Sequence, residues 1–313
     1  MRSRTVVAFG VLLAAAPGCS ADPKGELMLA IATDMAPPTD FDTIGIEIFR
    51  NGQPLQQKEY PELGAKGLIT FPATKAIVAN DDPSTPIEIR ISTRQGPQGT
   101  PRTLREALTT VPADRVALLR LPIEWLCLGS GYATSTNYVE SRCPEATTCI
   151  GGACLPWDID ASELPTYEEG LVFGGGSPKG EGGCFDTLPC FDDKTDVHSV
   201  DPPPADCTLD KPLGSDVNVA LVTKKGEGGI CGPEICLVPL DFDTPSGWHQ
   251  ASGKIVLPPG ICAPVPEFAG TPVKKVAVSR KCKTKTAETP TCGPWSAIDR
   301  PGNFDAGAPD GAL

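Results

Sequence analysis

Histidine is scarce in this chain: His198 and His249 are the only two among 313 residues. A Ser-His-Asp triad requires a histidine, and most zinc sites use one, yet neither residue has candidate partners at a motif spacing. The motifs G-x-S-x-G and H-E-x-x-H are absent as well. The sequence therefore predicts no catalytic residues, no metal site and no cofactor.

Two weaker signals for chemistry stay open. Asp192, Asp193 and Asp196 offer oxygen ligands that could hold a structural calcium ion. They lack the spacing and the glycine of an EF-hand, so a solvated acidic loop is the better interpretation. Paired carboxylates for glycoside hydrolysis need only the right separation in space, so the sequence does not exclude them.

Long apolar runs are missing beyond the first residues. The stretch from about Val6 to Ala16 follows Arg2 and Arg4, and it is too short to span a bilayer. Residues 1–18 therefore have the charge and length of a secretory signal peptide. No later stretch has 18 uninterrupted apolar residues, so we expect no membrane-crossing helix in the mature chain.

The end of this leader resembles the lipobox of bacterial lipoproteins. In that family the precursor is cut before a cysteine, which then carries the lipid. The small residues Ala16 and Gly18 before Cys19 resemble this pattern, although Leu is usual where Ala16 stands. The resemblance implies that Cys19 is the lipidated N-terminus of a short tether, 19–23, and that Ser20 favours the outer membrane. The alternatives are an ordinary signal peptide cut nearby and a buried first strand.

The cysteine count agrees with lipidation. The chain has 13 cysteines, and all except Cys19 lie at or beyond Cys127. An odd cysteine in an exported protein calls for an explanation, which a lipid on Cys19 supplies. The other twelve could form six disulfides in an oxidising compartment.

Charge and composition narrow the class further. The formal net charge is −12, and removal of residues 1–18 with their two arginines makes it −14. So acidic a protein is a poor non-specific ligand for nucleic acid. The 34 prolines and 33 glycines favour short strands joined by turns over helices. We therefore expect a mainly β protein with two antiparallel β-sandwich domains joined by a small disulfide-rich module.

Residues 24–126 alternate between apolar and polar side chains. The segment "ELMLAIA" places Leu27, Leu29 and Ile31 on one face, and the segments "TIGIEIF" and "IEIRIST" repeat the pattern. Seven candidate strands over about 100 residues predict a small antiparallel sandwich. "RTLREALTT" could be a short helix, but its spacing favours a strand. By pattern, the segment resembles immunoglobulin-like and transthyretin-like accessory domains.

Residues 127–157 are too few to bury a core and need cross-links. Their cysteine spacing resembles that of small EGF-like or knottin-like modules. The four cysteines allow three connectivities, of which we favour Cys127–Cys149 and Cys143–Cys154. An acidic, glycine-rich linker is expected at 158–183.

Residues 184–296 are expected to form a disulfide-rich β domain, followed by a disordered tail at 297–313. The order of its motifs resembles that of jelly-roll carbohydrate-binding domains. Candidate short-range bridges are Cys231–Cys236 and Cys282–Cys292. The cysteines expected to pair within this unit are Cys184, Cys190, Cys207, Cys231, Cys236, Cys262, Cys282 and Cys292.

Two surface features in this region could bind ligands. Read as one strand, "VKKVAVSRKCKTKT" directs a stripe of lysines to one exposed face, where they could attract an anionic glycan or lipid headgroup. The alternative is that they protect an edge strand. The stripe consists of Lys275, Lys281, Lys283 and Lys285. Trp248, Trp295 and Trp157 could stack on a glycan if they are exposed.

The whole chain resembles uncharacterised cysteine-rich lipoproteins of Gram-negative soil bacteria, a likeness that implies no activity. We therefore expect a non-enzymatic protein of the cell envelope, anchored in the outer membrane by its lipid, that serves as a binding, adhesion or structural module. Its partner would be a polysaccharide or another envelope protein. The alternative is a carbohydrate-active enzyme or its accessory carbohydrate-binding subunit.

Overall fold

The computed structural model describes residues 25–298 apart from 65–66, 68, 80–81, 98, 136–137, 175–182, 193–196, 202, 213, 215, 269–272 and 274. The predicted signal peptide, the lipid site at Cys19 and most of the predicted tail lie outside the described residues. So do Asp193 and Asp196 of the calcium hypothesis.

The first part of the chain forms two sheets from seven strands. One has the order β4-β1-β7 and the other β3-β2-β5-β6. The pairing is antiparallel except that β1 runs parallel to β7. The strands are β1 (Glu26–Ile31), β2 (Thr43–Arg50), β3 (Gln53–Tyr60), β4 (Ala73–Val78), β5 (Ile87–Arg94), β6 (Pro101–Thr109) and β7 (Val116–Arg120).

The apolar faces predicted from alternation meet between these sheets. Leu27, Leu29 and Ile31 of β1 are fully buried, as are Ile87 and Ile89 of β5. The strand prediction for "RTLREALTT" is confirmed by β6, which pairs along its length with β5. The mainly β, antiparallel class of the fold is therefore confirmed.

The cysteine-rich segment lies along the outer edge of β6. The hydroxyl of Ser130 accepts a hydrogen bond from the Leu104 amide at 3.0 Å, and that of Thr148 accepts one from the Glu106 amide at 2.8 Å. This satisfies an edge that would otherwise expose backbone donors. The segment contains η1 (Trp125–Cys127), β8 (Gly131–Ser135), β9 (Tyr138–Ser141), β10 (Thr147–Ile150) and β11 (Ala153–Pro156). The bridges Cys127–Cys149 and Cys143–Cys154 are confirmed.

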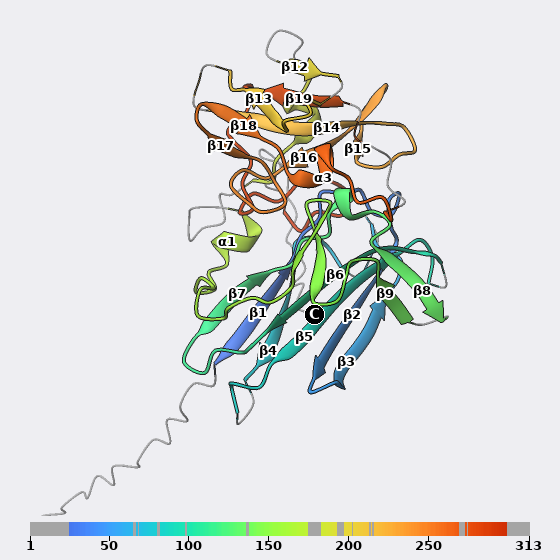
Figure 1. Cartoon of the computed structure of the whole chain (residues 1–313), viewed down its shortest axis with the longest axis vertical. Coiled ribbons are helices and arrows are strands. Elements are labelled where there is room, and N and C mark those ends of the chain that lie inside the picture. Colours follow the sequence, from blue (N-terminus) through green and yellow to red (C-terminus); the bar gives the residue numbers. More distant parts are fainter. Residues whose placement is uncertain are drawn as a thin grey trace, which may run out of the picture.

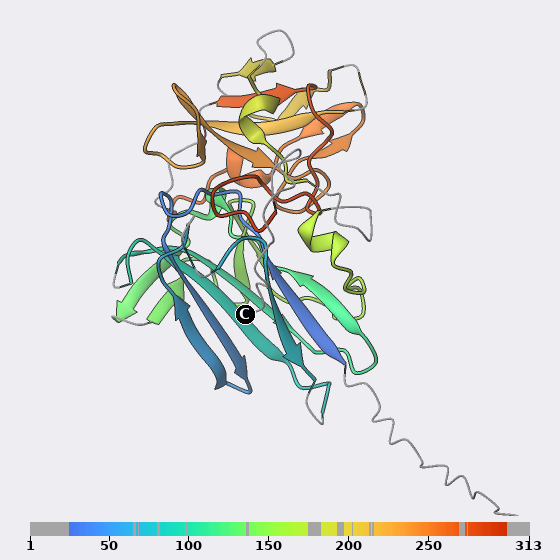
Figure 2. The same cartoon turned by 180° about the vertical axis from the view of Figure 1, so that it is seen from behind.

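Residues 158–174, expected to belong to a linker, pack against the first sheets instead. The amide of Leu118 donates a hydrogen bond to the carbonyl of Pro165 at 2.8 Å, and the amide of Tyr167 donates one to the carbonyl of Val116 at 2.8 Å. The short helix α1 (Gly170–Phe173) follows and buries Val172 against Ala30 and Leu118. Both views show α1 beside β7 (Figures 1 and 2).

The last part of the chain forms a five-stranded sheet with the order β12-β19-β14-β16-β15 and a three-stranded sheet with the order β13-β18-β17. These strands are β12 (Val197–Val200), β13 (Thr208–Asp210), β14 (Asn218–Lys224), β15 (Ile230–Cys231), β16 (Ile235–Leu240), β17 (His249–Ala251), β18 (Lys254–Val256) and β19 (Lys275–Ser279). Two short helices, α2 (Thr187–Cys190) and α3 (Pro259–Cys262), complete this part.

Eight cysteines pair within this part, as predicted, and the bridge Cys231–Cys236 is confirmed. The predicted bridge Cys282–Cys292 is wrong. Residues 184–190 return to the end of the sheet, where the Cys292 amide donates to the Phe185 carbonyl at 2.9 Å. The bridges are therefore Cys184–Cys292 and Cys190–Cys282, together with Cys207–Cys262.

The two β parts share an apolar core. The later sheets stack on one end of the first seven strands (Figure 1). One cluster of buried side chains contains Leu27 and Ile89 from the first part and Leu221 and Val276 from the last. A hydrogen bond also joins the two β parts: the carboxylate of Asp40 accepts it from the Gly229 amide at 2.8 Å.

Candidate functional site

A cavity of about 660 Å³ lies where these parts meet. This volume falls within the range of small-molecule sites, roughly 300–1,000 Å³. Its walls come from β1 and β7, the β10–β11 hairpin, the segment 158–174 and the loops at 241–246 and 286–288. We call it the junction cavity. Its apolar wall includes Leu118, Leu119, Ile150, Ile159, Val172 and Phe242.

Arg105 brings a buried charge to this cavity. It occupies an inward-facing position on β6, directly opposite Ile91 of β5 in the strand register. Its side chain is 8% exposed, and Nη1 donates a long hydrogen bond of 3.5 Å to the carbonyl of Cys149. Nε is buried and has no hydrogen-bond partner. Burial lowers the pKa of Arg105, and the nearby carboxyl groups of Glu124 and Glu106 partly oppose this shift by raising it.

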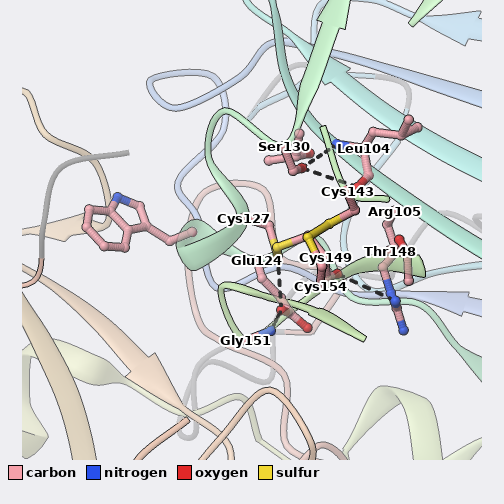
Figure 3. The surroundings of a disulfide bond; sticks show 12 residues. Leu104, Arg105, Glu124, Cys127, Ser130, Cys143, Thr148, Cys149, Gly151 and Cys154 are labelled. Atoms are coloured by element: carbon pink, nitrogen blue, oxygen red, sulfur yellow. Dashed lines mark hydrogen bonds between the residues drawn. A yellow bond between two sulfur atoms is a disulfide. The ribbon is translucent and has the colours of Figure 1, made fainter. Parts of the chain in front are cut away.

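Glu124, the residue directly before η1, lines the same cavity. Its Oε2 accepts a hydrogen bond from the amide of Gly151 at 2.6 Å, whereas its buried Oε1 has no partner. Gly151 and Gly152 form the β10–β11 turn with positive φ angles of 57° and 78°, which glycine adopts without strain. Figure 3 shows Glu124 and Arg105 on either side of Cys149.

Burial controls the protonation of Glu124. Loss of solvent around the carboxyl group raises its pKa, and the charge of Arg105, the Gly151 amide and the side chain of Ser246 oppose this shift. The pKa of Asp34 is raised well above its ordinary value by burial first and then by the neighbouring carboxyl group of Glu124. The cavity region therefore favours neutral carboxyl groups.

A third carboxylate, Asp241, is held by a cation. The ammonium group of Lys285 donates a hydrogen bond to Asp241 Oδ1, and the Lys285 side chain is only 6% exposed. Asp241 lines the junction cavity, and a smaller adjoining cavity is lined by Asp34, Asp241 and Lys285. The structure thus brings together two carboxyl groups, Glu124 and Asp241, on one cavity wall.

The predicted lysine stripe is wrong as a single exposed face. Strand β19 ends at Ser279 and lies between β12 and β14, so it is not an edge strand. Lys275 is half-buried on the strand, whereas Lys281 and Lys283 are exposed beyond its end. Lys285 is buried against Asp241, contrary to the expectation that it would be exposed.

The tryptophans proposed for glycan stacking are also not available at the surface. Trp248 is 2% exposed and packs against Phe242 with ring centroids 4.7 Å apart, and Trp295 is 5% exposed in the shared core. Trp157 is half-buried. Trp248 and Trp295 belong to the apolar core that the two β parts share.

No group of three or more His, Cys, Asp or Glu side chains among the described residues could hold a metal ion. Asp192, the described member of the calcium hypothesis, is exposed. His198 and His249 are exposed too, on β12 and β17.

Sequence reasoning missed the cavity residues. A signal did exist at Arg105, because a charged residue at a core-facing position of a strand must find a special environment. Glu124, between the buried Ile123 and Trp125, carries the same signal. The sequence does not show that these two residues line one cavity, because that depends on the path of the β10–β11 hairpin.

Comparisons of the chain with protein-family models, with curated proteins and with solved structures found no match. None of the helices in the described part of the chain is long and apolar enough to cross a membrane.

Proposed function

We propose that this protein is a lipid-anchored envelope protein that binds a small molecule in its junction cavity and does not transform it. The observation that carries the proposal is the combination of a cavity of about 660 Å³, an apolar wall and buried ionisable groups at Arg105 and Glu124. Ligand sites are typically concave and apolar with a few convergent polar groups. Pairing of all twelve cysteines from Cys127 onward supports an oxidising compartment.

A neutral solvatochromic dye tests the cavity. Nile red should bind the disulfide-intact protein saturably and with a blue-shifted emission. Ala287→Trp, which adds an indole at the cavity wall, should abolish or strongly weaken this signal. Ala251→Trp adds the same ring at an exposed position on β17 and should leave the signal unchanged. Equal binding by both variants would contradict the proposal.

The lipid anchor is tested separately. Intact-mass analysis of the protein from a bacterial envelope should show an acylated N-terminus at Cys19, and Cys19→Ala should lose that mass. Acyl chains contribute about 0.8 kcal/mol per buried methylene, so the unmodified protein should sediment with membranes and the variant should not. A lipid-free N-terminus at another residue would exclude this anchor.

A second candidate is a carbohydrate-active enzyme. The observation in its favour is that Glu124, with a raised pKa, and Asp241, paired with Lys285, line one cavity. Glycosidases use two carboxyl groups in different environments in this way. Release of reducing sugar from polysaccharides by the unmodified protein, lost in Glu124→Gln but kept in the exposed control Asp192→Asn, would favour the enzyme over the binding protein.

A further inference from the structure

Three residues that line the junction cavity keep a buried polar atom without a hydrogen-bond partner: Arg105, Glu124 and Thr244. Two of the three are ionisable. Arg105 Nε and Glu124 Oε1 have no hydrogen-bond partner, although both side chains are less than one-tenth exposed. Buried polar groups in folded proteins are nearly always paired, so each exception calls for an explanation. A polar group of a ligand that contacts both Arg105 Nε and Glu124 Oε1 would supply the missing hydrogen-bond partners.

The charges around this cavity favour a negatively charged ligand group. Arg105 and Arg120 both line the cavity. Asp241, the carboxylate on the same wall, is already engaged by Lys285. Asp243 and Glu288 also line the cavity, but both are exposed to solvent, which screens their charge. Lys285 offsets the charge of Asp241, and the two arginines outweigh the single negative charge that Glu124 carries when it is ionised.

Glu124 fits the same ligand. Burial raises the pKa of Glu124, and a proton carried on Oε1 leaves Oε2 free to accept from the Gly151 amide. A neutral carboxyl group donates one hydrogen bond, as Arg105 Nε also does. Both groups line the cavity, so each can offer one donor to a ligand carboxylate, which has two accepting oxygens.

One wall of the cavity is apolar and suits a hydrocarbon chain. Leu118, Ile159 and Val172 form part of a wall that comes from β7, the segment 158–174 and α1. This wall can bury an alkyl chain but offers few partners for the many hydroxyl groups of a sugar.

We propose that the junction cavity binds a straight-chain amphipathic monocarboxylate, with the carboxylate at Arg105 and Glu124 and the alkyl chain along the apolar wall. This inference rests on the proposed binding function and adds the class of ligand. Fatty acids are the simplest members of that class.

Calorimetric titration of the unmodified protein tests the inference at neutral pH, with decanoate and decylammonium below their micelle concentrations and decanol below its solubility limit. Decanoate should bind with one site and at least tenfold more tightly than decanol, and decylammonium should not bind. A series from hexanoate to decanoate should tighten by about fourfold per added methylene, because each methylene is removed from water.

Two variants test the polar contacts. Arg105→Met should weaken decanoate by about ten- to hundredfold, the usual effect of losing a hydrogen bond to a charged group, and should leave decanol binding unchanged. The exposed Arg142→Met is its matched control. Glu124→Gln keeps an acceptor for Gly151 and a donor for the ligand, so it should still bind decanoate.

The outcomes separate the two proposals. Equal affinities for decanoate and decanol, or a preference for decylammonium, would overturn the carboxylate inference while Nile red binding still upheld the cavity. Absence of both Nile red and decanoate binding would overturn both. If Arg105→Met does not fold, the three ligands compared on the unmodified protein still decide the question.

Discussion

Buried ionisable residues fall into two groups in this protein. Arg90 is 3% exposed and is fully engaged: its guanidinium lies 3.1 Å from Glu106, 3.6 Å from Glu47 and 3.7 Å from Glu88. Arg105 and Glu124 are equally hidden but keep an unpaired atom each. The first group stabilises the fold through its ion pairs, and the second group contains the residues that we propose as ligand contacts.

At the residue scale, we predict that Glu124 makes stability decrease as pH rises. Its pKa is raised on folding, so the folded state holds the proton more tightly than the unfolded chain does. The stability it contributes is therefore complete below its unfolded pKa, about 4.3, and is lost as pH rises toward the folded value.

Urea unfolding of the unmodified protein and of Glu124→Gln, measured between pH 4 and pH 8, checks this expectation. The glutamine variant should lack this contribution, so its stability should rise relative to the unmodified protein as pH increases. Asp34 and Asp40, whose pKa values are also raised, are present in both proteins and cancel in the comparison. A difference that does not change with pH would contradict the assignment.

At the scale of elements, the cysteine-rich hairpins act as a cover for strand β6. The hydroxyl of Thr148 is fully buried, and its acceptance of the Glu106 amide replaces a missing neighbouring strand. We predict that Thr148→Val destabilises the protein by about 1–3 kcal/mol, because it leaves that amide buried without a partner.

Thermal or urea unfolding checks this prediction against Thr147→Val. Thr147 is the adjacent residue, and its hydrogen bond to the Pro144 carbonyl is exposed, so water can replace it. A similar loss of stability in both variants would show that the buried hydrogen bond is not the cause.

The strands of this protein were predictable because each has a strong local pattern. Alternation at Leu27, Leu29 and Ile31 determined which face is buried, and the structure confirms that face. The prediction of a lysine stripe is wrong because it assumes that the strand continues past Ser279, where β19 ends. Local pattern carries no information about where a strand stops when the next residues belong to a disulfide-bonded loop.

At the scale of the whole molecule, nested disulfides control the last β part. Cys184–Cys292 spans 108 residues, and Cys190–Cys282 spans 92 residues within it. Once one of these bridges has formed, the other closes a loop of only about 16 residues, the difference between the two spans. A loop of that size contributes about 3 kcal/mol in the chain-entropy model. We predict that removing both bridges costs more than the sum of the two single losses, because only the double removal frees the long loop.

Urea unfolding without reductant checks this with C184A/C292A, C190A/C282A and the quadruple variant. Each double variant should lose about 3 kcal/mol. Strict additivity in the quadruple variant would mean that the two bridges do not share a loop constraint.

The long-range pairings and the junction cavity lay beyond sequence reasoning for the same reason. Cys184 and Cys292 are 108 residues apart in sequence, and the cavity that Arg105 and Glu124 line is closed by loops from the last β part, so both features depend on the tertiary fold. The short-range bridge Cys231–Cys236 was predictable because its two cysteines face each other across β15 and β16.

The position of β1 determines how the molecule bears mechanical load. The described chain enters directly at this strand, which lies in the middle of its sheet, antiparallel to β4 and parallel to β7. A pull on the preceding residues along the strand axis therefore stresses two ladders in shear at once, whereas an edge strand would peel from a single neighbour. Tension applied from the N-terminal side is thus carried straight into the sandwich core.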